Sequence, residues 1–286
     1  MRLLSFNIQY GFGRDDRYDL TRAAAVIAGA DIAAVQEVDR HWSRSGQDDQ
    51  PTLLAALLPD HFIAFAPGFD MAAPTTADRN RRRQFGPLIA SRWPILWTRQ
   101  HLLPMRRMIA PLNTQSCALE ACIATPDGPL RLISLHLAHV GVEERLTQID
   151  HLLQLHATAA LLGGPWSGTD DEPARNWTEG EPEPACPQSA VWMGDFNMEP
   201  GSAEYLRLTG QTPYHPHARY AHGLVDSVAL TGTVMHTHEK LIAGTRRLRQ
   251  LDHCLVTADL APRVRNAWTD TAEPASDHFP LWVELG

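Results

Sequence analysis

Cysteine is scarce in this sequence, which contains only Cys117, Cys122, Cys186 and Cys254. Cys117 and Cys122 lie five positions apart in a strand-like segment, where odd spacing points side chains to opposite faces. The spacing also lacks the C-x-x-C pattern of a cysteine zinc site. The sequence therefore gives no sign of a disulfide framework or of a thiolate zinc centre.

A surplus of positive charge is also missing. The chain has 25 Lys and Arg against 33 Asp and Glu, a formal net charge of −8 and a pI near 5.9. A protein that grips long duplex DNA through many phosphates needs a broad basic surface. This composition disfavours that class and leaves room only for a local basic patch.

No long hydrophobic run and no signal-peptide pattern are visible. The chain starts with "MRLLSFNIQY", a strand pattern without a basic region followed by a long apolar stretch. Nothing approaches the length of a membrane span. We therefore expect a cytoplasmic protein without a membrane span. Its 286 residues, 44% of them hydrophobic, predict one large core and a single domain over residues 1–286.

Short apolar strands alternate with helices along the chain, which predicts an α/β fold. Helices are expected over residues 20–29 and 142–160, where apolar positions recur on one face. The predicted strands are "LLSFNI", "DIAAVQEV", "FIAFAP", "FGPLIAS", "QSCALEACIA", "LRLISLHLA", "AVWMGDFN", "LDHCLVT" and "FPLWVEL". Two segments, Gly68 to Gln84 and Gly163 to Gln188, are expected to be irregular, and loops of that length are commonly functional or disordered.

Several predicted strands end on polar side chains, and "VWMGDFN" is the clearest example. These side chains are Asn7, Gln36, Glu37, His136, Asp195, Asn197 and Asp252, and "SDHFPLW" adds Asp277 and His278. In open α/β folds, ligand-contacting residues gather where strands end. We therefore expect these residues to converge on one cleft.

The residue types favour a hard divalent cation. Asn7, Glu37, Asp195 and Asn197 supply oxygen ligands without a thiolate, which suits Mg²⁺ or Mn²⁺ better than structural zinc. Histidines beside carboxylates would handle protons near neutral pH. The set indicates metal-assisted hydrolysis of a phosphate ester.

In these motifs the sequence resembles the endonuclease/exonuclease/phosphatase superfamily. The resemblance covers nearly the whole chain through "SFNIQ", "VQEV", "FGPLIASRWPI", "ISLHL", "MGDFN", "LDHCLVT" and "SDHFPLW", in that order. It implies a four-layer α/β sandwich, in which two mainly antiparallel sheets pack face to face with helices outside.

The resemblance also implies roles for individual residues. Glu37 resembles the principal metal ligand, with Asn7 beside it and Asp277 at the metal or just behind it. The implied catalytic residues are His136, Asp195, Asn197, Asp252 and His278, with Asp252 orienting His278. Gln9 and His253 stand where abasic-site endonucleases carry an acidic residue and a tyrosine, which weakens the case for an abasic-site endonuclease.

Simpler interpretations exist for several of these residues. Glu37 could be a solvated strand end, Asp195 and Asn197 could form a turn, His136 could be a core histidine, and Asp252 could cap a strand. The ordered motif set favours the functional interpretation. The pairs His215 with His217 and His236 with His238 are expected to be surface residues.

Two arginine clusters predict a local anion site. Arg81, Arg82 and Arg83 precede "FGPLIASR" and could bind the non-scissile part of an anionic substrate, although such a run is often only a solvated loop. The second cluster is Arg246, Arg247 and Arg249. Both clusters favour a focused phosphate site. The first cluster, the net charge of −8 and the segment from Gly163 to Gln188 together suggest a locally basic pocket under a lid.

The function that these observations favour is divalent-metal-dependent hydrolysis of a phosphate ester, by a phosphodiesterase of small or lipid-headgroup substrates. A nuclease acting on DNA or RNA is the alternative within the same chemistry, and a catalytically silent binding module is the alternative outside it. Filled motif positions disfavour the silent module, while fold alone would not decide. The sequence leaves the oligomeric state and the substrate open.

Overall fold

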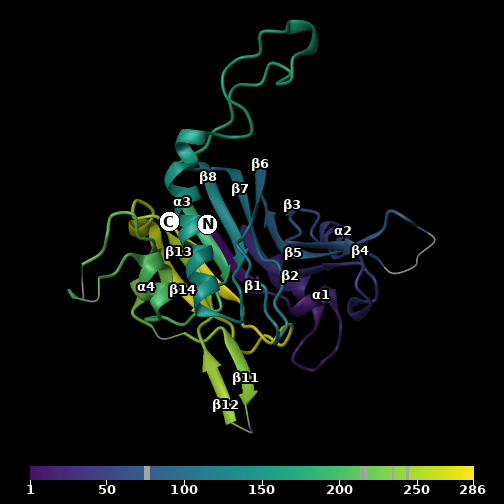
Figure 1. Cartoon of the computed structure of the whole chain (residues 1–286), viewed down its shortest axis with the longest axis vertical. Helices are drawn as coiled ribbons and strands as arrows, with labels where there is room; N and C mark the ends of the chain where they lie inside the picture. Colours follow the sequence, from purple (N-terminus) through teal and green to yellow (C-terminus); the bar gives the residue numbers. More distant parts are fainter. Residues whose placement is uncertain (74–77, 213, 216–217, 234, 243–244) are drawn as a thin grey trace.

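The structure is a computed structural model that describes residues 1–73, 78–212, 214–215, 218–233, 235–242 and 245–286. Two β-sheets pack face to face, and helices cover their outer surfaces (Figure 1). The described part of the chain contains no helix with both the length and the apolar character needed to cross a bilayer. All four cysteines are free.

The first sheet carries both the beginning and the end of the chain. Within the described residues its path is β14-β15-β1-β2-β5-β3, and β4 also pairs with β5. Strand β1 runs parallel to β2 and antiparallel to β15. The strands are β1 (Arg2–Asn7), β2 (Ile32–Arg40), β3 (Phe62–Phe65), β4 (Phe69–Ala72), β5 (Arg82–Ser91), β14 (Val264–Thr269) and β15 (Leu281–Leu285).

The second sheet is built from the middle of the chain. Its path over the described residues is β10-β13-β9-β8-β7-β6, with β8 and β9 parallel. The strands are β6 (Ile95–Leu102), β7 (Cys117–Thr125), β8 (Gly128–His136), β9 (Ala190–Asp195), β10 (Val225–Asp226) and β13 (Asp252–Val256). A separate hairpin, β11 (His238–Ile242) with β12 (Thr245–Arg249), extends beyond the sheets.

The helices confirm the two sequence predictions. Helix α1 (Leu20–Ile27) begins where the Asp19 carboxylate accepts a hydrogen bond from the Thr21 amide, and α3 covers Val142–Leu162. The other helices are α2 (Gln50–Leu57), α4 (Ala203–Thr209) and α5 (Ser227–Thr231), with 3-10 turns at Gln9–Gly11, Ser43–Ser45, Pro173–Arg175 and Ala261–Arg263.

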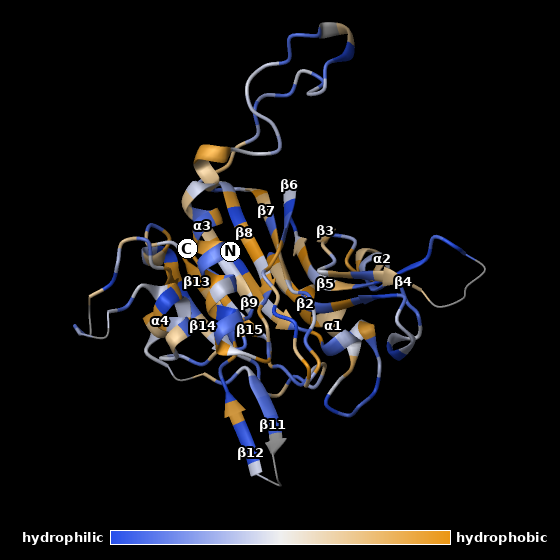
Figure 2. Cartoon of the chain, viewed as in Figure 1, coloured by the Kyte–Doolittle hydropathy of each residue, from blue (hydrophilic) through white to orange (hydrophobic). Residues whose placement is uncertain are grey.

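Three apolar cores separate the layers. One lies between the sheets and contains Leu3, Ile89 and Val191, and a second joins the first sheet to α1 through residues such as Phe6 and Ile27. The third packs α3 and α4 on the second sheet around Trp192. Figure 2 shows the apolar residues concentrated on the inner strands. The fold is the predicted four-layer α/β sandwich.

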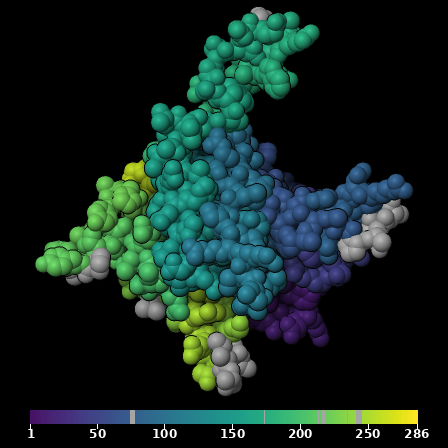
Figure 3. Space-filling view, viewed as in Figure 1, coloured from purple at the N-terminus to yellow at the C-terminus, as the bar shows by residue number. Residues whose placement is uncertain are grey.

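The two segments expected to be irregular behave differently. The segment from Gly68 to Gln84 contains β4 and the start of β5, which pair as a hairpin, so the prediction was wrong there; residues 74–77 lie outside the described residues. The segment from Gly163 to Gln188 is irregular apart from the turn at Pro173–Arg175, as predicted, and it protrudes from the body (Figure 3).

The protruding segment does not cover the cleft. Helix α3 starts shortly after His136 and has 21 residues, so its far end lies about 30 Å away. The segment leaves from that far end, where Arg99 donates hydrogen bonds to the carbonyls of Gly163 and Gly164. The expectation of a lid over the pocket was therefore wrong.

Candidate active site

Strand pairing brings the polar strand ends together. His136 lies opposite Asp195 in the parallel pair β8 and β9, and Asp252 lies opposite Asp195 in the pair β9 and β13. Asn7 ends β1 beside Gln36 of the parallel strand β2. One part of the cluster thus lies at the strand ends of the first sheet and the other part at the strand ends of the second sheet. Face-to-face packing of the two sheets brings these strand ends together.

Asp195 lies at the centre of this cluster. Its Oδ2 accepts a hydrogen bond from Asn7 Nδ2 at 3.2 Å and lies 3.4 Å from His136 Nε2 and 3.7 Å from His278 Nε2. Burial alone would raise the pKa of Asp195, but the charges of His136 and His278 and the Asn197 amide hold it below the usual range. The carboxylate is therefore ionised at neutral pH.

His278 is held by a second buried carboxylate. Its Nδ1 lies 2.7 Å from Asp252 Oδ2, and the Asp252 amide donates to Thr237 Oγ1 at 2.9 Å. Burial alone would lower the pKa of His278, but Asp252 and then Asp195 raise it to about 10. The ring is therefore protonated at neutral pH, with Nε2 directed toward Asp195.

Glu37 owes its position to an irregularity in β2. The pairing of β2 with β5 shifts register between Val35 and Val38, and Glu37 takes a left-handed backbone conformation with φ of 61°. Such bulges redirect side chains near active sites. Glu37 Oε1 accepts a hydrogen bond from Asn7 Nδ2 at 3.0 Å. Burial and then the charge of Glu37 raise the pKa of the neighbouring Tyr10.

The donor set around Glu37 fits a hard cation. Burial raises the pKa of Asp277, and although His278 opposes this, the charges of Glu37, Asp195 and Asp252 add to the rise. Carboxylates crowded in this way repel one another, and a divalent cation would relieve that repulsion. The residues that could hold it, namely Asn7, Glu37 and Asp277, offer oxygen ligands suited to Mg²⁺ or Mn²⁺.

His238 departs from the surface position expected for it. It is 6% exposed, its ring lies 4.7 Å from that of His278, and its Nε2 lies 3.9 Å from Asp277 Oδ2. The ligand atoms of His238, Asp277 and His278 lie within 4.8 Å of one another. The surface expectation was wrong for His238 because Phe279 and Thr237 form a backbone link that draws it inward. His236 is half-buried, His215 is exposed, and His217 lies outside the described residues.

Gly194 allows Asp195 to approach His136 closely. A Cβ atom at Gly194 would lie 1.9 Å from the Leu135 carbonyl oxygen, a distance that no side chain tolerates. Asn197 then turns the chain with φ of 50°, donates its amide to Asp195 Oδ1 and donates Nδ2 to the Leu137 carbonyl. The "GDFN" stretch therefore fixes Asp195 from both sides.

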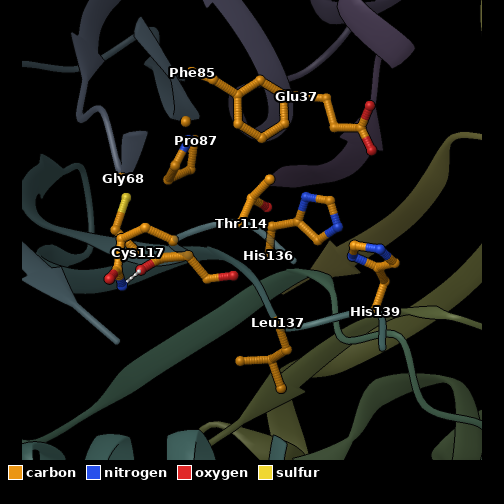
Figure 4. Close-up of a pocket in the computed structure, with 12 residues that line it drawn as sticks. Glu37, Gly68, Phe85, Pro87, Thr114, Cys117, His136, Leu137 and His139 are labelled. Carbon is orange, nitrogen blue, oxygen red and sulfur yellow. Dashed lines mark hydrogen bonds between the residues drawn. The ribbon is translucent and has the colours of Figure 1, made fainter. Parts of the chain in front are cut away.

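A large cavity opens beside Glu37 and His136. We call it the aromatic cavity, because rings of Tyr10, Trp42, Phe69 and Phe85 line its volume of about 590 Å³. A narrow pocket of about 30 Å³ shares several of its residues, and Figure 4 shows Glu37, Phe85 and His136 around that pocket. The candidate catalytic groups thus lie at one wall of a space large enough for a ligand.

The arginines predicted to bind substrate do not line this cavity. Arg82 pairs with Asp70 at 2.8 Å, Arg81 donates to the Gln47 carbonyl, and Arg83 lies over the Trp42 ring. Arg44, which was not among the arginines predicted to bind substrate, lines the cavity instead. Its guanidinium carbon lies 3.8 Å from the Tyr10 ring centroid, and it pairs with the buried Asp39 at 2.8 Å.

Sequence reasoning also missed the residues that orient the cluster. Ser276 Oγ donates to the Asn7 carbonyl at 2.6 Å and accepts from the His278 amide at 3.1 Å, which ties the two ends of the chain together. Thr237 holds the amides of Leu251 and Asp252. The one sequence feature that could have identified Ser276 is its position in "SDH", next to Asp277 and His278. No comparable sequence feature points to Thr237.

Solved structures with the same fold have low sequence identity to this chain. An endonuclease/exonuclease/phosphatase family protein from Leptotrichia buccalis has a TM-score of 0.66, 16% identity and coverage of 100% of this chain and 99% of its own. A mannosyl-6-phosphatase from Bacteroides thetaiotaomicron has a TM-score of 0.63, 17% identity and coverage of 100% and 99%. A humanized D. rerio TDP2 has a TM-score of 0.60, 15% identity and coverage of 100% and 98%.

Among curated proteins, no sequence matches this chain. The family model described as "Endonuclease/Exonuclease/phosphatase family" matches residues 4–278, which include both Asn7 and His278. Family, fold and the order of the motifs agree over nearly the whole sequence. The chain therefore belongs to the endonuclease/exonuclease/phosphatase family.

Proposed function

We propose that this chain is a divalent-metal-dependent phosphodiesterase of small or lipid-headgroup substrates. The observation that carries the proposal is the placement of Asp195 Oδ2 between two imidazoles, 3.4 Å from His136 Nε2 and 3.7 Å from His278 Nε2. One ionised carboxylate flanked by two imidazole rings suits a reaction that takes a proton from water and stabilises a charged phosphorane. Because the contributing residues run from Asn7 to His278, we treat residues 1–286 as one catalytic domain.

The metal-binding part of the proposal rests on Glu37, Asn7 and Asp277. Mg²⁺ or Mn²⁺ bound there would polarise the phosphoryl group of the substrate. Glu37 is directed toward the cavity by the bulge in β2, and Asn7 is already oriented because its Oδ1 accepts the Gln9 amide at 3.0 Å. Asp277 lies beside them, where neighbouring carboxylates favour a bound cation.

The protein groups divide the proton chemistry between them. Asp195 is ionised and accepts the proton of the attacking water. His278, kept protonated by Asp252, donates a hydrogen bond to a developing phosphorane oxygen. His136, on the other side of Asp195, is placed to contact a phosphoryl oxygen or to protonate the leaving group. Asn197 fixes the Asp195 carboxylate through its backbone amide.

A nuclease remains the alternative within this chemistry, but the described arginines do not favour it. Arg82 and Arg246 are already paired with Asp70 and Glu239. The net charge of −8 also disfavours the broad cationic track on which backbone contacts to long nucleic acid depend. A silent binding module is disfavoured because Glu37, Asp195 and His278 are already oriented by hydrogen bonds within the cluster.

A substrate panel under controlled metal conditions tests the proposal. A bis-aryl phosphate, an aryl monophosphate, sphingomyelin and supercoiled plasmid DNA are assayed with EDTA, Mg²⁺ or Mn²⁺. We expect diester turnover that EDTA abolishes and either metal restores. Glu37→Gln should abolish turnover while keeping the fold by circular dichroism, and Glu143→Gln, an exposed carboxylate on α3, should behave as wild type. Full activity after removal of metal would contradict the mechanism, and plasmid cleavage with a steep salt dependence would favour the nuclease.

A further inference from the structure

The loop between β6 and β7 exposes an apolar surface beside the candidate site. Residues 105–112, which we call the apolar tip, are all exposed, and they include Met105, Met108, Ile109 and Leu112. Ile109 is fully exposed and Leu112 is 75% exposed. Neighbouring apolar side chains exposed in this way usually mark an interaction surface.

The base of this loop is firmly held, so the exposure of the tip is built into the fold. Gln115 Nε2 donates to the carbonyls of Leu103 and Ser116 at 2.6 and 2.9 Å. Asn113 Nδ2 donates to the buried Glu144 carboxylate at 2.8 Å and to the Arg106 carbonyl at 3.0 Å. These bonds hold both ends of the tip against the body of the protein.

The tip is continuous with the reaction site. Ala118 pairs with Leu135, so the start of β7 lies beside the His136 end of β8. Met105 and Leu112 line the aromatic cavity together with Glu37 and His136. The apolar part of a ligand that arrives at the tip could therefore enter the cavity while its phosphate ester lies at Glu37 and His136.

The charge of the tip indicates the kind of surface that it fits. Arg106 and Arg107 are both exposed between the apolar residues, and within the described residues neither forms an ion pair. A second copy of the chain, related by a twofold axis at the tip, would place these arginines against one another. Aromatic residues, which dominate protein interfaces, are absent from residues 105–112. Aliphatic side chains mixed with arginine are typical of segments that lie on an anionic lipid surface.

We propose that the apolar tip docks on an anionic lipid surface and that the enzyme takes its substrate, a lipid phosphate ester, from that surface. The proposal rests on the proposed function for the chemistry of the ester. It adds that aliphatic Ile109 and Leu112 insert among the lipids, that Arg106 and Arg107 contact anionic headgroups, and that the aromatic cavity receives the apolar part of the substrate.

Vesicle binding tests the docking directly. Wild-type protein is sedimented with phosphatidylcholine vesicles that contain or lack phosphatidylserine. We expect binding that depends on phosphatidylserine and falls at least roughly 10-fold in the double variant Met108→Ser with Ile109→Ser, two exposed residues of the tip that do not line the aromatic cavity. Replacing Arg106 and Arg107 by Gln should lower binding roughly 5-fold for each arginine. The matched control is Leu161→Ser with Leu162→Ser, because these leucines are 87% and 61% exposed at the far end of α3.

A soluble diester separates this proposal from the proposed function. All variants should hydrolyse the bis-aryl phosphate like wild type, which also shows that they fold. Diester turnover without vesicle binding by wild type would overturn the docking and leave the proposed function standing. Vesicle binding without turnover of any ester would overturn the proposed function and leave the docking standing. Equal loss of binding in the control, or a dimer in sedimentation velocity that the tip variant abolishes, would also overturn the docking.

Discussion

The candidate site has two regions that differ in the contacts that form them: a floor, consisting of Asp195, Asp252 and His278, and the aromatic cavity beside it. On the floor, Asp195, Asp252 and His278 are buried and joined by contacts of 2.7 to 3.7 Å. In the cavity, rings surround the Arg44 guanidinium, and the apolar tip extends beyond them into solvent. The floor holds the proposed reacting groups through short polar contacts, whereas the cavity offers apolar area with few directional contacts. Reaction chemistry and substrate choice are therefore expected to respond to different mutations.

The largest effect is expected on the floor. His278→Ala should lower kcat by about 10²–10⁴-fold with little change in KM, because it removes a proton-bearing group that acts on the transition state. Asp252→Asn should lower kcat less, since the ring stays but loses its charged partner. Steady-state kinetics on the bis-aryl phosphate measure both, with His215→Ala, an exposed histidine, as control. Near wild-type kcat in His278→Ala would place the reaction elsewhere.

A second prediction concerns the protonation of the floor. The pKa of His278 is raised from 6.5 to about 10 by Asp252 and Asp195 against the effect of burial. A raised pKa stabilises the fold most fully below pH 6.5, and that contribution is lost as the pH rises toward about 10. In metal-free protein, NMR titration should show a protonated His278 at pH 8, and Asp252→Asn should move its pKa down toward 6.5. A neutral ring at pH 8 in wild type would contradict the assigned electrostatics.

The sequence predicted the floor far better than the cavity, and the reason is physical. The proposed reacting groups must be particular residue types at strand ends, so Glu37, Asp195 and His278 leave a recognisable trace in "VQEV", "MGDFN" and "SDHFPLW". An apolar wall can be built from many residues on many loops. Trp42, Phe69 and Leu112 are brought together only by the tertiary fold.

His238 and Thr237 show the same limit on the floor itself. Thr237 directly precedes β11 and His238 begins it, far along the chain from Asn7, and both reach the site through backbone hydrogen bonds between Thr237 and both Arg249 and Phe279. No spacing rule links these positions. By contrast, the alternation of strands and helices followed from local periodicity, and the four-layer arrangement followed from the family resemblance of the motifs.

The third prediction tests whether the arginine run outside the cavity lining affects substrate binding. Replacing Arg81, Arg82 and Arg83 together by Ala should raise KM by at most about 5-fold and lower kcat less, because the run reaches the cavity only through Arg83, which lies over the Trp42 ring of the lining, and a partly exposed cation contributes at most about 1 kcal/mol. The structure ties these arginines to Gln47, Asp70 and Ala72, outside the cavity lining. Michaelis curves at low and high salt decide the matter. A fall in kcat larger than the rise in KM would show that the run shapes the floor.

The smallest effect is expected at the other end of the molecule. Gly164 and Pro184 approach closely at the base of the protruding segment, so residues 166–182 can be replaced by a short Gly-Ser linker without moving the bonds from Arg99 and Trp97. The deletion removes a largely exposed segment about 30 Å from His136, together with the half-buried Trp166. We therefore expect unchanged kcat, unchanged KM and the same ranking of diester over monoester, with at most a small change in Tm by differential scanning calorimetry. An altered ranking of substrates in this variant would mean that the segment reaches the cavity in solution. Substrate choice would then depend on residues outside the aromatic cavity as well.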